Sequence, residues 1–270
     1  MNNRLGAKPS VMTQPINNLF DLSGKVALVT GASGGIGMAV CKALAEQGTR
    51  LALVDINASA LESQKKELMS AGASVETYLG HVEKKADCEN IAAAVVGAFG
   101  TVDILVNLAG INTRMRPELY DDELWSRIID VNLKGTFNMC QAVFPVMQKS
   151  GRGKIVNIGS ILALSSNAVT AAYSASKGGV LQLTRSLACA WATDGINVNV
   201  LQPGWIDTKL SRQARIDIPG HAERVVNTTP LGRWGEPADL IGPVIFLASP
   251  ASDFMTGASV VVDGGVLAHV

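Results

Sequence analysis

Three side chains in the second half of the chain could together move a proton to or from a substrate oxygen. Tyr173 and Lys177 form a Tyr-x-x-x-Lys pair, and Ser160 precedes them. Reducing a ketone needs a proton donor to its oxygen, but a tyrosine with the ordinary pKa of about 10 is poorly matched to neutral pH. A nearby ammonium stabilises the phenolate and lowers that pKa, while a serine hydroxyl can hold the reacting oxygen. The trio predicts acid–base catalysis at a carbonyl or an alcohol.

A glycine-rich turn near the N-terminus is suited to the pyrophosphate of a dinucleotide. The segment from Thr30 to Gly37 reads Thr-Gly-Ala-Ser-Gly-Gly-Ile-Gly and follows a short apolar run. Glycine is needed where the chain turns tightly and where a side chain would block the phosphate, and the N–H groups of the following helix attract an anion. A tight strand–helix turn without a ligand is the alternative. We expect the turn to bind cofactor through Gly31, Ser33, Gly34, Gly35, Ile36 and Gly37.

A carboxylate at the end of the next apolar run indicates which dinucleotide binds. Asp55 can accept hydrogen bonds from both ribose hydroxyls of NAD, and it would repel the 2′-phosphate of NADP. Its neighbours Ile56 and Asn57 supply no positive charge. An ordinary strand-end or helix-capping aspartate is the alternative. The sequence predicts NAD(H), with Asp55 and Ile56 beside the ribose.

Strand-like and helix-like segments alternate along the whole chain. Strands are expected over residues 25–30, 51–55, 74–79, 102–107, 154–159, 196–201 and 259–262, and helices over 35–48, 58–71, 86–99, 121–149, 171–193 and 236–248. This alternation predicts a doubly wound α/β fold of Rossmann type, a parallel sheet of about seven strands with helices on both faces. Ligands in such sheets lie beyond the carboxyl ends of the strands, so Ser160, directly after a strand, falls on the cofactor side.

Composition limits the classes of partner. The chain has 270 residues, 47% of them hydrophobic, and no linker after residue 22, which indicates one catalytic domain over 21–270 behind a flexible extension over 1–20. With 17% charged residues and zero net charge, neither nucleic acid nor a membrane surface is expected as a partner, and no metal site is expected. The four cysteines, Cys41, Cys88, Cys140 and Cys189, are widely spaced and are expected to be buried side chains in a reducing compartment. No signal peptide is evident, so we expect a cytoplasmic protein.

Taken together and in this order, the motifs resemble the short-chain dehydrogenase/reductase family over residues 21–267. The glycine turn matches that family's TGxxxGxG, and Ser160, Tyr173 and Lys177 match its catalytic residues. Further matches are Asn107-Leu108-Ala109-Gly110 for NNAG, Asn132 for a helix asparagine, the segment from Pro203 to Thr208 for PGxxxT, and Asp263-Gly264-Gly265 for the C-terminal turn. The resemblance implies that Asn132 is a fourth catalytic residue, which holds a water in a proton path from Tyr173 through a ribose hydroxyl and Lys177. It also implies a homotetramer, with the long helices at one interface and the C-terminal segment at another.

The resemblance also implies cofactor contacts away from the glycine turn. These residues are Asn107, Ala109, Gly110, Tyr173, Lys177, Pro203, Gly204, Ile206 and Thr208. His81-Val82 stands where the family commonly has Asp-Val beside the adenine. Val82 is expected to pack on the ring, and His81 to be an adenine neighbour or an exposed loop residue. Leu108 replaces the second asparagine of NNAG, which implies local repacking.

Substrate contacts are expected from loops 111–116, 161–166 and 205–234, the last forming a lid. The candidates are Asn112, Arg114, Leu162 and Trp205, which combine two polar groups suited to a hydroxyl or carboxylate with two apolar walls. Solvated loop charge is the alternative for any arginine. The stretch from Arg233 to Pro243 resembles the branch acting on sugar acids and polyols. We therefore expect an NAD(H)-dependent oxidoreductase acting on a small-molecule secondary alcohol or ketone. The alternatives are a 3-oxoacyl-carrier-protein reductase, against which Asp55 argues, and a non-catalytic NAD-binding regulator.

Overall fold

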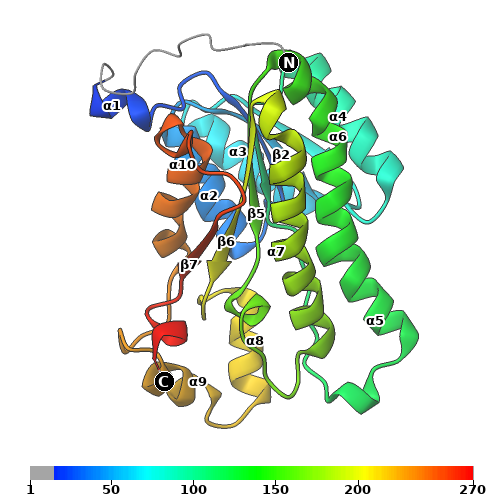
Figure 1. Ribbon diagram of the computed structural model, residues 1–270, viewed down its shortest axis with the longest axis vertical. Coiled ribbons are helices and arrows are strands. Elements are labelled where there is room, and N and C mark those ends of the chain that lie inside the picture. The colour runs from blue at the N-terminus through cyan, green and yellow to red at the C-terminus, as the bar shows by residue number, and fades with distance from the viewer. Residues whose placement is uncertain (1–14, 270) are drawn as a thin grey trace, which may run out of the picture.

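The seven strands form one parallel sheet in the order β3-β2-β1-β4-β5-β6-β7 (Figure 1). The computed structural model describes residues 15–269. The strands are β1 (Val26–Thr30), β2 (Arg50–Asp55), β3 (Val75–Leu79), β4 (Ile104–Asn107), β5 (Gly153–Ile158), β6 (Ile196–Pro203) and β7 (Ser259–Val262). The chain runs outward from β1 to β3 and returns to β4, so the strand order reverses between β1 and β4, where such sheets bind their ligands. The predicted doubly wound α/β fold is confirmed.

Helices cover both faces of the sheet (Figure 1). One face packs against α2 (Gly35–Glu46), α3 (Ala58–Ser70) and α10 (Ile241–Ala248). The other packs against α4 (Lys85–Phe99), α6 (Gly135–Ser150) and the far end of α7 (Ala171–Trp191). Alternation along β1 divides its side chains between the two cores, because Ala27 and Val29 join the first and Val26 and Leu28 the second.

The predicted helix over 121–149 is wrong in one respect, because it is interrupted by a π-helical turn. The segment consists of α5 (Asp122–Ile129), a π turn over Asp130–Lys134, and α6. Asn132 lies in the π turn with its side chain fully buried. A π turn widens the helix locally and is frequent at functional sites. Apolar periodicity carries no signal for it, since the helix continues on both sides.

The lid region contains two helices that periodicity did not indicate, α8 (Lys209–Asp217) and α9 (His221–Thr228). Figure 1 places both beyond the carboxyl ends of the strands. The predicted helix over 236–248 begins as a 3₁₀ turn (Pro237–Leu240), closed by a capping box between Glu236 and Asp239, and continues as α10.

Two further expectations concern the N-terminus and the cysteines. Within the expected flexible extension, the structure has a short helix α1 (Ile16–Leu19), while residues 1–14 lie outside the described part. Cys41, Cys88 and Cys140 are buried as expected, but the expectation is wrong for Cys189, which is exposed. Across residues 15–269, no helix has the length and apolar character required to cross a bilayer.

Candidate active site

A cleft of about 530 Å³ opens at the carboxyl end of the sheet, and it brings together most residues selected from the sequence. Its lining includes Gly31, Gly34, Gly35, Ile36, Gly37, Gly110, Asn112, Arg114, Ser160, Leu162, Tyr173, Lys177, Pro203, Gly204, Trp205, Ile206 and Thr208. Other predicted site residues do not line it, namely Ser33, Asp55, Ile56, His81, Val82, Asn107, Ala109 and Asn132. The lining joins the glycine turn to the Ser–Tyr–Lys trio and to all four substrate candidates.

The glycine turn is shaped so that side chains at two of its positions would collide with backbone. Gly31 has φ +64°, and a Cβ there would lie 2.7 Å from the Ala109 nitrogen. A Cβ at Gly37 would lie 2.2 Å from the Gly31 carbonyl oxygen. The turn leads into α2, whose first N–H groups have no helical partner of their own. A compact backbone surface at a helix N-terminus fits the pyrophosphate of a dinucleotide.

Asp55 fastens the end of β2 to this turn. Its Oδ2 accepts a hydrogen bond from the Ser33 N–H at 3.1 Å, and its Oδ1 accepts from the N–H groups of Ile56 and Asn57 at 2.8 and 3.1 Å. Asn57 in turn caps α3 through its side chain, which accepts from the Ala60 N–H. The carboxylate therefore stays at a fixed place at the edge of the glycine turn.

The expected adenine neighbours lie on the loop that follows β3. His81 is exposed; its N–H donates to Asp87 Oδ2 at 2.9 Å, and its ring Nδ1 lies 3.1 Å from Glu83 Oε1. Val82 is buried, and its carbonyl accepts from Asn138 Nδ2 at 2.9 Å. His81 therefore lies outside the protein core, whereas Val82 packs against α6.

The catalytic candidates come from two neighbouring elements. Ser160 lies two residues after the end of β5, where its Oγ accepts from the Leu162 N–H at 3.1 Å and hydrogen-bonds the Tyr173 hydroxyl. Tyr173 and Lys177 are on successive turns at the start of α7. Lys177 Nζ donates to the Ile158 carbonyl at 2.7 Å and lies 5.7 Å from the centre of the Tyr173 ring. All three side chains line the same cleft.

Burial and neighbouring groups shift the pKa values of Tyr173 and Lys177. Burial raises the pKa of Tyr173, and this is opposed by the hydrogen bond from Ser160 and by the positive charge of Arg114. Lys177 is itself buried, and burial lowers its pKa to about 8. Ser160 and Arg114 therefore favour the Tyr173 phenolate in the folded chain, and the expectation that the Lys177 ammonium does so as well stays a prediction.

Asn132 holds the loop after β4 rather than lining the cleft. Its Oδ1 accepts from the Ile111 N–H at 2.8 Å, and its Nδ2 donates to the Ile111 carbonyl at 2.9 Å and to Ser176 Oγ at 3.0 Å. A Cβ on Gly110 would lie 3.3 Å from Asn132 Oδ1 and 3.6 Å from Lys177 Nζ. The asparagine amide and the lysine ammonium thus flank the same glycine, and Asn132 connects the π turn, this loop and α7.

Asn107 and Ala109 support the sheet below the cleft. Asn107 is buried, and its Nδ2 donates to Asn157 Oδ1 at 2.9 Å, while Asn157 donates to Thr184 Oγ1 at 2.9 Å. The Ala109 N–H donates to Thr30 Oγ1 at 3.3 Å. These bonds connect β1, β4, β5 and α7, and they explain why two residues of the NNAG-like segment lie behind the cavity wall.

The region expected to form a lid, residues 205–234, contains an aromatic cluster that sequence reasoning missed. Trp205 meets His221 edge-to-face at 5.2 Å between ring centroids and Trp234 at 6.1 Å. Arg215 stacks 3.9 Å above the Trp234 ring and also pairs with Asp207 at 3.1 Å. His221 is buried, and burial together with nearby guanidinium groups lowers its pKa. Trp205 lines the cleft, and the rings of His221 and Trp234 pack against it.

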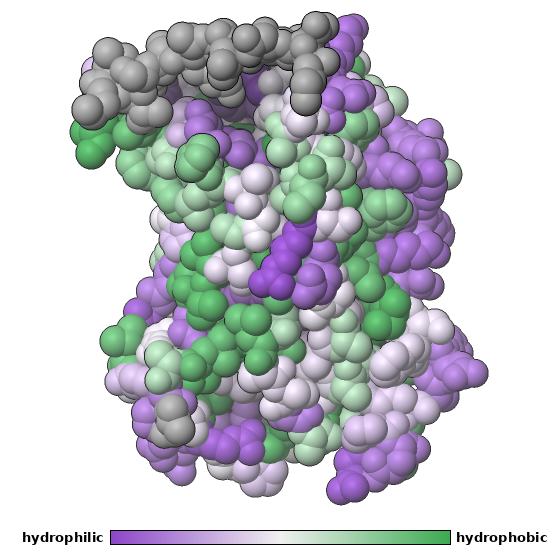
Figure 2. Space-filling model, viewed as in Figure 1, coloured by the Kyte–Doolittle hydropathy of each residue, from purple (hydrophilic) through white to green (hydrophobic). Residues whose placement is uncertain are grey.

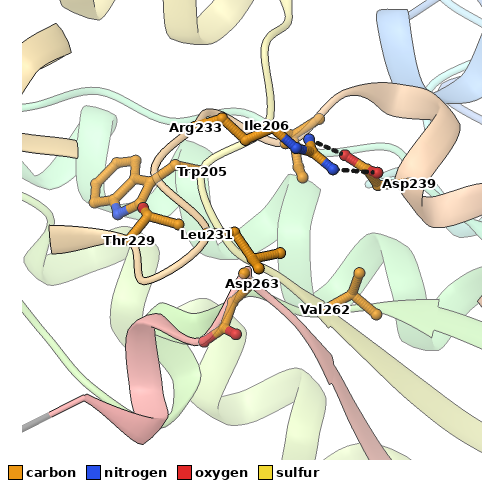
Figure 3. Close-up of a pocket in the computed structure, with 10 residues that line it drawn as sticks. Trp205, Ile206, Thr229, Leu231, Arg233, Asp239, Val262 and Asp263 are labelled. Atoms are coloured by element: carbon orange, nitrogen blue, oxygen red, sulfur yellow. Dashed lines mark hydrogen bonds and ion pairs between the residues drawn. The ribbon is translucent and has the colours of Figure 1, made fainter. Parts of the chain in front are cut away.

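A second, smaller cavity of about 150 Å³ shares Trp205 and Ile206 with the cleft and extends to the end of β7 (Figure 3). Arg233 makes a two-point contact with Asp239 there, at 2.7 and 2.9 Å, and this holds the pKa of Asp239 down to about 2. The pair ties the end of the lid to the 3₁₀ turn before α10. Among residues 15–269, no group of three or more His, Cys, Asp or Glu side chains is placed to hold a metal ion.

Comparisons with known proteins agree with this geometry. A family model described as enoyl-(acyl carrier protein) reductase matches residues 31–267. Galactitol 2-dehydrogenase (L-tagatose-forming) from Cereibacter sphaeroides is 41% identical over 92% of this chain and 96% of its own. The 2-dehydro-3-deoxy-D-gluconate 5-dehydrogenase of Dickeya dadantii is 39% identical over 94% of this chain and 100% of its own. The crystal structure of a gluconate 5-dehydrogenase from Burkholderia cenocepacia in complex with NADP and tartrate has a TM-score of 0.90, with 36% identity, and covers 94% of this chain and 99% of that one. The chain therefore belongs to the short-chain dehydrogenase/reductase family and is an oxidoreductase.

Proposed function

We propose that this protein is an NAD(H)-dependent dehydrogenase that interconverts a secondary alcohol and a ketone on a sugar, polyol or sugar acid. The observation that carries the proposal is the cleft, which is lined both by the glycine turn and by the hydrogen-bonded pair of Ser160 and Tyr173 with Lys177 beside it. One cavity with a dinucleotide-binding turn and a proton donor is what hydride transfer coupled to proton transfer requires.

The chain's own residues would handle the proton and the substrate oxygen. When bound, the nicotinamide supplies or accepts the hydride. In the reducing direction, Tyr173 donates its hydroxyl proton to the ketone oxygen, and Ser160 Oγ–H donates a hydrogen bond to the same oxygen as charge develops. Arg114 stabilises the phenolate that remains, and Lys177, whose pKa is about 8, can pass a proton toward it near neutral pH. The oxidising direction reverses each step.

The preference for NAD is supported by Asp55. Its carboxylate is fixed at the edge of the glycine turn by three backbone N–H groups, so it cannot readily swing away from a ribose 2′ position. A 2′-phosphate there would meet a negative charge. The structure of the Burkholderia cenocepacia relative contains NADP, so the cofactor preference of this protein must be measured with both NAD(H) and NADP(H).

The substrate class is supported by the cleft and by the relatives. Asn112 and Arg114 present polar groups on one part of the lining, and Leu162 and Trp205 present apolar walls on another. A hydroxylated carbon chain offers both kinds of surface. The relatives named above act, by their names, on galactitol and on a deoxygluconate derivative. Arg212 and Arg215 do not line the cleft as Arg114 does, so they are weaker candidates for a substrate contact.

The test is a substrate panel followed by the absorbance of reduced nicotinamide. Polyols, aldonic and deoxyaldonic acids and a 3-oxoacyl thioester are each assayed with NAD(H) and with NADP(H). Turnover of a polyol or sugar acid with NAD supports the proposal. Turnover of the thioester alone, with NADPH, would replace it by a 3-oxoacyl-carrier-protein reductase. Tight NAD binding without turnover of any member would indicate a regulator.

We further propose that the protein is a homotetramer. β7 is an edge strand of the sheet, and Figure 2 shows apolar residues gathered around it. Val261 on β7 and Phe254 before it are exposed, as are Trp125 on α5 and Phe137 on α6. These positions coincide with the two interfaces implied by the family resemblance. Light scattering on the eluting protein tests this, and a monomeric mass at micromolar concentration would contradict it.

A further inference from the structure

The backbone N–H of Ser160 is bound by a side chain from the neighbouring strand. The ladder between β5 and β6 ends where the Gly159 N–H donates to the Leu201 carbonyl at 2.8 Å. The next N–H, that of Ser160, donates to Gln202 Oε1 at 2.6 Å. Gln202 is fully buried in β6. The Gln202 amide oxygen therefore replaces a backbone carbonyl as the acceptor at the point where the chain leaves the sheet and enters the cleft lining.

Gln202 is itself held from both sides. Its Nε2 donates to Ser259 Oγ on β7 at 3.3 Å, so its amide connects β7 to the segment that follows β5. Gly159 leaves the space that the amide occupies, because a Cβ there would lie 2.0 Å from Gln202 Oε1. The backbone of Gly159 has no positive φ, so this contact is the reason that the structure gives for a glycine there.

The hydrogen bond to Gln202 is one of two hydrogen bonds that restrain the Ser160 backbone. The Ser160 carbonyl accepts from the Ala163 N–H at 2.8 Å, and its N–H is bound to Gln202. With both peptide groups restrained, the Cα–Cβ direction is set, and Oγ is directed to the Leu162 N–H and the Tyr173 hydroxyl. Losing the Gln202 acceptor leaves a buried N–H without its partner, which favours rearrangement of the loop.

We propose that Gln202 is a positioning residue that acts on the reaction through Ser160, by holding its backbone N–H so that its hydroxyl meets Tyr173 and the substrate oxygen. Gln202 is not among the residues that line the cleft. The inference rests on the roles proposed above for Ser160 and Tyr173.

The main variant is Gln202→Met, which keeps the length of the side chain and removes the acceptor. A displacement of about 1 Å in a reacting group costs up to about 100-fold in rate, so we expect kcat to fall about 10- to 100-fold while the Kd for NAD, measured by fluorescence, stays within about twofold. Because the Ser160 hydrogen bond lowers the pKa of Tyr173, losing it should also move the basic limb of the pH profile for ketone reduction to higher pH. Ser259→Ala is the matched control, because it removes the other partner of the same amide, and its kcat should stay near that of the native protein.

A double-variant cycle separates positioning from general damage. In a Ser160→Ala background, Gln202→Met should lower the residual kcat by less than about twofold, because the residue through which it acts is already gone. Equal losses in both backgrounds, or native kcat in Gln202→Met alone, would overturn the proposal. If Gln202→Met does not fold, Gly159→Ala displaces the amide without changing it and enters the same cycle with the same two outcomes. Native activity in Ser160→Ala alone would instead refute the proposed function of the site.

Discussion

Replacing Lys177 with methionine should remove activity and yet relieve the folded chain of a buried charge. The lysine side chain is buried, and its pKa falls from 10.5 to about 8 because burial disfavours the ammonium. Each unit of pKa shift corresponds to about 1.36 kcal/mol, so the shift represents a destabilisation of about 3 kcal/mol at pH 7. Methionine has a similar length and no charge, and it forfeits the hydrogen bond to the Ile158 carbonyl, which offsets about 1–3 kcal/mol of the gain.

The stability difference between Lys177→Met and the native protein should also depend on pH. Between about pH 8 and 10.5, the unfolded chain holds a proton on Lys177 that the folded chain has released, so the free energy of unfolding rises with pH through this window. The destabilisation is fully present below the folded pKa and falls to about 1 kcal/mol at pH 9.5. The stability advantage of Lys177→Met over the native protein should therefore shrink by about 2 kcal/mol between pH 7 and pH 9.5.

Urea unfolding of both proteins at the two pH values measures this difference. Burial also raises the pKa of Cys88 and Cys140 to about 12, but both proteins contain these thiols, so their effect cancels in the difference. Lys66→Met, at a side chain that is 75% exposed, is the matched control and should show no pH-dependent difference. A constant offset between Lys177→Met and the native protein at both pH values would refute the reasoning that burial sets the state of this lysine.

Two predictions concern ligand selection. Asp55→Asn removes the charge and keeps one oxygen for the backbone N–H groups. It should raise kcat/KM with NADPH relative to NADH by about tenfold or more, since about 1.4 kcal/mol of repulsion is enough for that change. An unchanged ratio would contradict the role of Asp55. Arg114→Ala should raise KM for a sugar acid more than for a neutral polyol. It should also move the acidic limb of the pH profile for alcohol oxidation to higher pH, because Tyr173 must be deprotonated to accept the alcohol proton and the Arg114 charge lowers its pKa. Arg116→Ala is the matched control in the same loop, since Arg116 is exposed and paired with Glu118; equal effects of Arg114→Ala on both substrates would count against a carboxylate contact.

The sheet and the cleft lining followed from the sequence because their signals are local. A parallel strand buried on both faces reads as a continuous apolar run, as in β1, and a glycine turn between strand and helix is visible as spacing. Since the carboxyl ends of such strands share one edge, the placement of Ser160 near Tyr173 could be deduced without coordinates. The cofactor preference and the catalytic roles remain predictions.

The parts that escaped prediction depend on contacts between distant segments. Gln202 reaches Ser160 from a different strand, and nothing in the residues around either one indicates the bond. The π turn at Asn132 and the packing of His221 and Trp234 around Trp205 likewise depend on which surfaces meet. The effect of the Arg114 charge on the pKa of Tyr173 also depends on how the fold brings the loop after β4 to α7.

The most direct measurement on the central claim is the turnover of Tyr173→Phe with its cofactor affinity measured in parallel. The change removes one oxygen atom from a ring that otherwise keeps its place at the start of α7. We expect kcat to fall by about 10²–10⁴-fold, the range for loss of a general acid, with the Kd for NAD unchanged within about twofold. Turnover close to that of the native protein, with a substrate that the native protein accepts, would contradict the claim that the Tyr173 hydroxyl moves the proton.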